Sequence, residues 1–318
     1  MSKRDVLLVA ENDWANTGYR FSKCLRMLDL DVLMIKKFYH PFMYPEQAIV
    51  HPELRGLSSE LPSVQSLVDS SKVLHFIAST VLGGVKLNGQ KKVVQHGGSV
   101  YRQNANDMNK EFSDVDATII QCPDLLGLGA KNESLIYYPV DTDMIKPTGN
   151  GGKKLRIGHF PSNPEVKGSD MIERLMRAMK IEYEFKYDFE YVGSRETVPW
   201  RDNLKRMGEC DIIIECLNPQ QGKAVYGEWG NTALEAAALG KIVITNSLKE
   251  DIYKQEYGHC ELLIANSLNA MKNHLGLLLD GGININHKKE ATRQWVVEKH
   301  SMKATAERLW NKVYKELV

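Results

Sequence analysis

Short, nearly continuous apolar runs recur along the chain, and each is followed by a polar loop and then by a segment with helical spacing. Continuous runs are typical of parallel strands that are covered on both faces, whereas half-exposed strands alternate apolar and polar residues. Alternation of such strands with helices predicts an α/β fold with parallel sheets. The runs predicted to be strands are Asp5–Ala10, Asp31–Lys36, Lys72–Ala78, Lys91–His96, Ala117–Gln121, Leu135–Val140, Leu155–Phe160, Phe185–Val192, Asp211–Glu215, Lys241–Thr245 and Glu261–Ile264.

The segments between these runs carry apolar residues at the spacing of one helical stripe. The clearest example is Met171–Met179, and helices are also predicted over Tyr19–Leu28 and from Asn231 to Leu239. The last segment, Ser301–Val318, has an apolar face as well. We interpret it as a helix that closes a core.

The length of the chain, 318 residues, is about twice the ~150 residues of a typical domain. A polar stretch with three glycines, Thr148–Lys154, divides it into two halves that each begin with a strand. We therefore expect Rossmann-like domains at 1–148 and 149–300, joined by a hinge in this stretch. The predicted helix at 301–318 follows them and can cross back to the first domain.

Composition narrows the class of protein. Lys plus Arg is 41 and Asp plus Glu is 40, so the formal charge of +1 shows no nucleic-acid footprint. No apolar run approaches the ~18 residues that a membrane span needs. The five cysteines are scattered and never spaced Cys-x-x-Cys. This usage is typical of reduced thiols in a cytoplasmic protein rather than of disulfides or a zinc site.

Two candidate sites lie at the carboxyl ends of predicted strands in the first half, where doubly wound sheets bind ligands. The loop Glu11–Gly18 opens a helix, whose N-terminus favours anions, and Gly18 would let the backbone approach a ligand. The loop lacks a GxGxxG fingerprint, and a plain tight turn is an equal alternative. His96 ends its strand before two glycines and is well placed to touch a substrate, although a lone histidine is more often structural.

The second half offers a cation and a carboxylate. Lys167 stands just ahead of a helix predicted to start at Ser169 or Asp170, so its ammonium and free backbone N–H groups suit a phosphate or diphosphate. A solvated loop lysine is the alternative. Glu235 lies among alanines and leucines in the helix that starts at Asn231. A buried carboxylate needs a partner, and vicinal sugar hydroxyls match its two acceptors.

Three motifs, quoted in order, resemble those of the retaining GT-B glycosyltransferases of family 4. They are Tyr138–Pro147, which is similar to the segment between the two domains of that family; His159-Phe-Pro-Ser-Asn163 with Lys167-Gly168; and the stretch from Gly227 to Gly240 that contains Glu-Ala-Ala-Ala-Leu-Gly. Together they cover about residues 135–245. The resemblance implies a GT-B fold, with two Rossmann-like domains whose parallel sheets face each other across a cleft.

The resemblance also implies roles for individual residues. Lys167 would hold the donor diphosphate, Glu235 would bind the ribose hydroxyls, and His96 would face the transferred sugar. The catalytic residues implied are His96 and Lys167, and the donor-binding residues are Thr17, Gly18, Ser162, Lys167, Gly227, Glu228, Asn231, Thr232 and Glu235. Neither a metal ion nor another cofactor is expected, because lysine and helix N-termini neutralise the leaving diphosphate in that family.

Two positions depart from the family pattern. Gly227 stands where the family usually has a glutamate, with Glu228 one residue later, and Ser162 lies where an arginine usually assists the lysine. The hydroxyls of the donor sugar would then be read by backbone amides or by the shifted Glu228. These departures leave room for weak catalysis, an unusual donor or a non-catalytic relative.

The leading hypothesis is therefore a retaining hexosyltransferase with its nucleotide-sugar donor on the second half and its acceptor on the first. The alternatives are a non-catalytic nucleotide-sugar-binding protein and an epimerase or phosphorylase of the same fold. The acceptor, whether sugar, lipid or another molecule, is not named by any motif. The aromatic stretch Ile35–Tyr44 is compatible with an acceptor site, with peripheral membrane contact, or with loop packing, which we favour.

Overall fold

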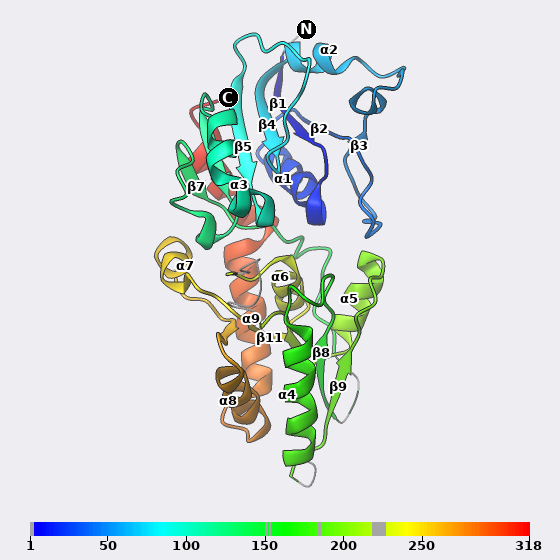
Figure 1. Ribbon diagram of the computed structural model, residues 1–318, viewed down its shortest axis with the longest axis vertical. Helices are drawn as coiled ribbons and strands as arrows, with labels where there is room; N and C mark the ends of the chain where they lie inside the picture. The colour runs from blue at the N-terminus through cyan, green and yellow to red at the C-terminus, as the bar shows by residue number, and fades with distance from the viewer. Residues whose placement is uncertain (1–2, 150–151, 153, 184–185, 218–226) are drawn as a thin grey trace. The chain divides into compact units, whose positions relative to one another are not determined.

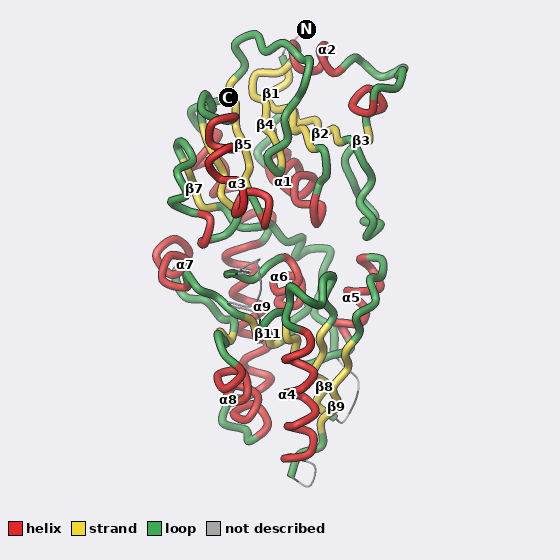
Figure 2. Tube along the Cα trace, viewed as in Figure 1, coloured by secondary structure: helices red, strands yellow, loops and turns green. Residues whose placement is uncertain are grey.

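The computed structural model describes residues 3–149, 152, 154–183, 186–217 and 227–318. They form two compact units, one made of Met1–Pro139 with Met302–Val318 and the other of Val140–Ser301 (Figure 1). Each unit combines helices with a sheet in which every described strand pair is parallel (Figure 2). The predicted α/β class with two Rossmann-like units is confirmed.

The first unit has a seven-stranded sheet with the order β3-β2-β1-β4-β5-β6-β7. Its strands are β1 (Arg4–Ala10), β2 (Val32–Lys36), β3 (Ile49–Val50), β4 (Ser71–Ile77), β5 (Lys91–His96), β6 (Ala117–Ile120) and β7 (Glu133–Leu135). Its helices are α1 (Thr17–Arg26), α2 (Val64–Asp69), α3 (Gly98–Glu111) and α10 (Met302–Leu309), with short helical turns η1 (Trp14–Asn16), η2 (Pro52–Arg55), η3 (Pro123–Leu125) and η4 (Trp310–Tyr314).

The second unit has a five-stranded sheet with the order β12-β11-β10-β8-β9. Its strands are β8 (Leu155–His159), β9 (Phe189–Gly193), β10 (Ile212–Ile214), β11 (Ile242–Thr245) and β12 (Leu263–Ile264). Its helices are α4 (Ser169–Glu182), α5 (Trp200–Gly208), α6 (Asn231–Ala238), α7 (Glu250–Tyr257), α8 (Leu268–Leu279) and α9 (Ile285–His300). None of the helices in the described part of the chain has the length and apolarity that a membrane span requires.

The central strand β1 explains why the apolar runs are continuous. Val6 and Leu8 face a cluster that includes α1 and α10, whereas Leu7 and Val9 face a second cluster that includes α2 and α3. All four side chains are fully buried. A strand covered on both faces needs apolar residues at every position, which is the pattern that the sequence carries.

The C-terminal segment packs in the first unit. Tyr314 in η4 lies 2.7 Å through its hydroxyl from His75 Nδ1 on β4, and the Cys24 thiol on α1 contacts the Met302 sulfur on α10 at 3.9 Å. Together with the apolar residues of α10, these contacts place the predicted C-terminal helix over one face of the sheet.

The chain enters the second unit earlier than the predicted boundary at 148. Thr148 donates its amide to Leu239 and its hydroxyl to the Gly208 carbonyl, and the buried Lys241 ammonium donates to both the Thr148 and the Gly208 carbonyls. These bonds hold the segment after Val140 inside the second unit. Of the predicted hinge at 148–154, residues 150, 151 and 153 lie outside the described residues.

Two strand predictions differ from the structure, and one strand, β3, was not predicted. In the run Leu135–Val140, only Leu135 belongs to a strand. The run is apolar because most of its side chains are buried in the segment that leads to the second unit. β3 has two residues, too few to show a period. β9 begins at Phe189 rather than at residue 185, which lies outside the described residues.

Candidate functional site

Both sheets have a topological switch point, where the strand order reverses and the loops after two neighbouring strands diverge. In the first sheet this point lies between β1 and β4, and in the second between β8 and β10. The paired residues Val9 and Phe76 mark the first, and Ile157 and Ile212 mark the second. Ligands of such folds bind beyond the carboxyl ends of these strands. Residues that bind a ligand are therefore expected near these two switch points.

Lys167 lies at the switch point of the second unit, but it is already ion-paired. Its ammonium contacts the carboxylate of Glu215, which directly follows β10. The other Glu215 oxygen accepts from the Thr245 hydroxyl at the end of β11, at 2.7 Å. The side chains of Lys167 and Glu215 are 11% and 1% exposed. Sequence reasoning missed Glu215, although an acid that ends a continuous apolar run is itself unusual.

The start of α4 differs from the predicted arrangement of free amides beside Lys167. The Gly168 amide donates to the Glu165 carbonyl at 3.2 Å, and the Ser169 amide donates to the Pro164 carbonyl at 3.0 Å. Loop carbonyls thus take two of the donors that a phosphate was expected to use. Ser162 lies exposed in the same loop.

His159 fixes the geometry of this switch point. The imidazole is buried and bridges the Ile214 carbonyl through Nδ1 and the Ser169 hydroxyl through Nε2, each at 2.8 Å. Burial lowers the pKa of His159, which favours the neutral ring. A neutral ring that donates from Nδ1 to the carbonyl can accept from the serine hydroxyl at Nε2. β8, β10 and α4 are therefore held together around the Lys167–Glu215 pair.

The helix α6 starts at Asn231, as predicted, and the residue before it lies near the same carboxylate. Gly230 is the residue before the helix, and a Cβ on it would lie 3.8 Å from Glu215 Oε1. Asn231 and Thr232 are half-buried in the first turn. The Lys167 ammonium and the N-terminal end of α6 thus both lie near Glu215, whose carboxylate is the anion at this switch point.

Glu235 is buried in α6, with 4% of its surface exposed. Its Oε1 accepts a hydrogen bond of 2.9 Å from the Trp200 indole on α5. The sequence argument required a partner for this carboxylate, and the tertiary structure supplies one from within the chain.

Glu228 is bound within the chain through both oxygens. Oε1 accepts from the Leu248 and Lys249 amides at 3.0 and 2.7 Å, and Oε2 accepts from the Ser247 hydroxyl at 2.7 Å. The neighbouring Gly227 carbonyl also accepts from Leu248, at 2.8 Å. Glu228 therefore holds the loop before α7, and this use competes with its predicted role of reading a donor sugar.

In the first unit, the N-terminus of α1 is capped by a carboxylate of its own chain. Asp13 is buried and accepts from the Gly18 and Tyr19 amides at 2.7 and 3.0 Å, while the Thr17 hydroxyl donates to the Trp14 carbonyl. Burial raises the pKa of Asp13 to about 6. The anion expected at this helix is thus Asp13, which sequence reasoning overlooked.

Gly18 serves packing between helix and sheet. A Cβ at this position would lie 2.6 Å from the Met34 side chain on β2 and 3.0 Å from the Ile77 side chain on β4. Real Cβ atoms do not approach so closely, so only glycine lets α1 lie this near the strands. Gly18 thus allows α1 to approach the sheet closely, whereas the sequence predicted that it allows the backbone to approach a ligand.

His96 ends β5, as predicted, but lies in the interior of the first unit with 1% of its surface exposed. Its Nδ1 is 2.8 Å from the Ser79 hydroxyl, and its ring stacks on Tyr101 of α3 with centroids 4.1 Å apart. Burial lowers its pKa to about 4, so the ring is neutral at neutral pH. This geometry fits the structural alternative better than direct contact with a sugar.

Comparison with known proteins identifies the fold. No protein-family model matches the sequence, and no curated protein matches it in sequence. Anabaena HepE in complex with UDP-glucose is similar with a TM-score of 0.61 and 10% identity, over 98% of this chain and 100% of that one. AviGT4, a glycosyltransferase involved in avilamycin A biosynthesis, is similar with a TM-score of 0.54 and 12% identity, over 98% and 97% of the two chains.

TarM is similar with a TM-score of 0.53 and 12% identity over 76% of this chain, which spans only about half, 54%, of TarM. At such low sequence identity, the structural similarity shows the fold but not the activity. The chain therefore shares the GT-B fold, with two Rossmann-like units, of these structures.

Proposed function

We propose that this chain is a glycosyltransferase that moves a hexose from a nucleotide-sugar donor to an acceptor, with retention of configuration and without a metal ion, as family 4 enzymes do. The observation that carries the proposal is the convergence of Lys167 and the N-terminal end of α6 on the buried Glu215 carboxylate. A cation and a helix N-terminus together favour an anion. Support also comes from the fold, which is shared with a structure that contains UDP-glucose.

In this proposal the donor diphosphate joins Glu215 as a second anion beside Lys167. Glu215 remains bound to the Thr245 hydroxyl and to the lysine ammonium, which has three N–H donors and also donates to the phosphate oxygens. Negative charge develops on the diphosphate as its bond to the sugar breaks, and a fixed ammonium and helix dipole stabilise that charge more than they stabilise the intact donor. Positioning and electrostatics are then the catalytic contributions of the second unit.

A second candidate, a non-catalytic nucleotide-sugar-binding protein, is favoured by Glu228. Its carboxylate is fully used by the loop at 247–249, and Gly227 has no side chain to read a sugar. An assay of donor hydrolysis and transfer separates the two functions. Binding of a UDP-sugar with no turnover over a broad acceptor panel would favour the binding protein.

The test of the proposed donor site is Glu235→Gln. Gln keeps a carbonyl oxygen for the Trp200 indole, so the melting temperature without ligand should be nearly unchanged. A carboxylate that accepts from two ribose hydroxyls loses an acceptor in Gln, which should cost ~1.5–3 kcal/mol, or roughly ten- to a hundredfold in UDP affinity. Isothermal titration calorimetry with UDP measures this loss.

The matched control is Glu290→Gln, which makes the same change at an exposed position of α9. It should alter neither the melting temperature nor the UDP affinity. Unchanged UDP binding in Glu235→Gln would remove this residue from the donor site and with it the ribose contact that the proposal requires.

A further inference from the structure

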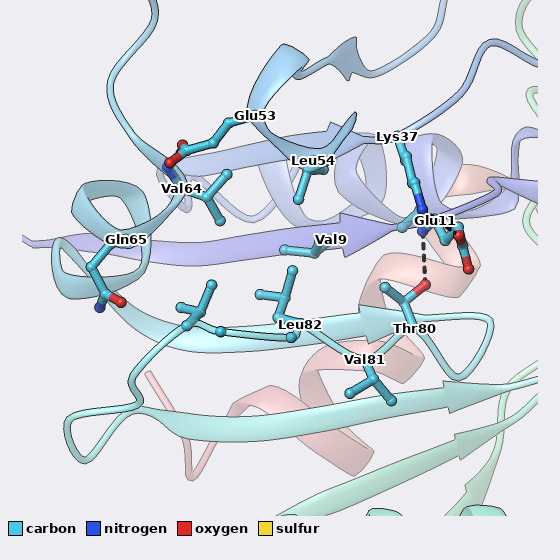
Figure 3. Close-up of a pocket in the computed structure, with 14 residues that line it drawn as sticks. Val9, Glu11, Lys37, Glu53, Leu54, Val64, Gln65, Thr80, Val81 and Leu82 are labelled. Atoms are coloured by element: carbon cyan, nitrogen blue, oxygen red, sulfur yellow. Dashed lines mark hydrogen bonds and ion pairs between the residues drawn. The ribbon is translucent and has the colours of Figure 1, made fainter. Parts of the chain in front are cut away.

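A cavity of about 350 Å³ opens in the first unit over the carboxyl-terminal part of β1 (Figure 3). Its position follows from the helices that cover that face of the sheet. The connection from β3 to β4 contains only the four-residue η2 and the six-residue α2, and residues 78–90 between β4 and β5, all of them described, contain no helix. Layered α/β folds normally cover such a face with long helices, whereas short elements and loops cover this one and leave a cavity between them.

Apolar side chains line one part of the cavity, although polar atoms make up more of its exposed lining than apolar atoms do. Val9 of β1, Leu54 of η2, Val64 of α2 and Leu82 of the following loop gather around it (Figure 3). The polar side chains at this end are bound within the chain. The Glu53 carboxylate accepts from the Val64 amide, and the side-chain amide of Gln65 exchanges two hydrogen bonds of 2.9 Å with the Lys86 backbone. Val9 and Val64 are buried by their neighbours, so the apolar surface that a ligand can contact there belongs to the partly buried Leu54 and Leu82.

The mouth of the cavity is polar and lies at the switch point between β1 and β4. Glu11 and Lys37 form an ion pair of 2.8 Å, and their side chains are 54% and 34% exposed. The Thr80 hydroxyl is fixed between the Glu11 amide and the Ile77 carbonyl. A carboxylate only accepts and an ammonium only donates, so a hydroxyl, which does both, can bind to the two together. The pair has no net charge and does not favour an ion.

We propose that this cavity binds the acceptor of the transferase, a neutral amphipathic alcohol. Its apolar body lies against Leu54 and Leu82, and its hydroxyl lies between Glu11 and Lys37. The assignment rests on the proposed function, which requires an acceptor hydroxyl. The volume lies in the range of small-molecule sites, and the mouth is at the edge where doubly wound sheets bind ligands.

The test titrates butan-1-ol, hexan-1-ol and octan-1-ol into the full chain by calorimetry, without nucleotide. Affinity should rise roughly fourfold for each added methylene, which is the transfer free energy of one CH₂ group. Leu82→Trp fills the cavity and should weaken octan-1-ol binding at least tenfold. Leu87→Trp is the matched control, because Leu87 is 41% exposed in the same loop and does not line the cavity. Equal affinities of the two variants, or no dependence on alcohol length, would overturn the proposal.

A second variant does not depend on the packing of the loop. Glu11→Ala removes an exposed hydroxyl partner and should weaken octan-1-ol binding about fivefold, the value of one ordinary hydrogen bond. An unchanged affinity would overturn the placement of the hydroxyl.

Titration of UDP in parallel separates this inference from the proposed function. Leu82→Trp should bind UDP like the unmodified chain. If UDP binds and the alcohols do not, the acceptor cavity is wrong while the transferase proposal stands. If the alcohols bind and UDP does not, the cavity is real but its assignment as an acceptor site falls together with the proposed function.

Discussion

Each unit carries a lysine–glutamate pair at its switch point, but burial makes the two pairs physically different. The Glu11–Lys37 pair of the first unit is open to water, whereas the Lys167–Glu215 pair of the second is almost fully buried. Water screens the first pair, and exposed pairs of this kind contribute little to stability. Removal from water makes each charge of the second pair depend on the other.

The comparison shows how one pair of residue types can suit two kinds of ligand. An exposed pair beside an apolar cavity can adjust to a neutral hydroxyl and leaves recognition to shape. A buried ammonium needs polar partners, and the Lys167 ammonium has an anion, Glu215. A negatively charged ligand that binds beside Glu215 would meet a cation already held in place by that carboxylate.

The largest effect is expected from breaking the buried pair. Lys167→Met leaves the Glu215 carboxylate buried without its cation, and should lower the free energy of unfolding by about 3–5 kcal/mol. Urea denaturation followed by tryptophan fluorescence measures the loss. The double variant Lys167→Met/Glu215→Gln removes both charges and should recover most of it. A double variant as unstable as the single one would mean that the lysine stem, rather than its charge, matters.

An intermediate effect is expected from acid, through the neutral buried histidines of the first unit. Burial lowers the pKa of His75 from its ordinary 6.5 to about 3. Below pH 6.5 His75 becomes protonated in the unfolded chain but stays neutral in the folded chain, so the free energy of unfolding falls as the pH falls. Between pH 6.5 and 5 this group should cost about 2 kcal/mol, since one pKa unit corresponds to ~1.36 kcal/mol.

The measurement compares the pH dependence of unfolding in the unmodified chain and in His75→Phe. In the variant, the free energy of unfolding should fall by about 2 kcal/mol less between pH 6.5 and 5 than in the unmodified chain. This holds whatever the stability of the variant at neutral pH after losing the contact with Tyr314. His287→Phe, at an exposed position of α9, is the control and should keep the full slope. An equal slope in His75→Phe would contradict the neutral state assigned to this ring.

The smallest effect is expected from the exposed pair. Lys37→Met should lower the free energy of unfolding by no more than about 1 kcal/mol, with the difference shrinking in high salt. The same urea assay applies, so this substitution is directly comparable with Lys167→Met. A loss as large as that of the buried pair would erase the distinction between the two switch points.

Much of the fold was predictable because its signals are local. The continuous run Val6–Ala10 specifies a strand covered on both faces, and the stretch from Asn231 to Gly240 specifies a helix with a clear stop. Lys167 was also predicted to lie just ahead of a helix, since the loop and the helix that follows it are contiguous in the sequence. Its ligand-binding role, like those of the other candidate residues, stays a prediction.

The partners of the candidate residues were not predictable in the same way. Asp13 lies close to Gly18 in the sequence, and a carboxylate shortly before a helix is a capping signal that could have been read. Glu215 lies far from Lys167 in the sequence, and Trp200 far from Glu235. No periodicity or spacing connects such residues, because their separation reflects the order of strands in the sheet.

The sequence by itself determined the α/β class, the two-unit organisation, and most of the strands, because apolar periodicity and helix caps act over a few residues. The tertiary structure alone decided which charges are buried and what each one faces. It also left the cavity over β1, because that depends on how much of a sheet face two short connections can cover. Burial and pairing arise from the packing of distant segments, and it is these that separate the exposed Glu11–Lys37 pair from the buried Lys167–Glu215 pair.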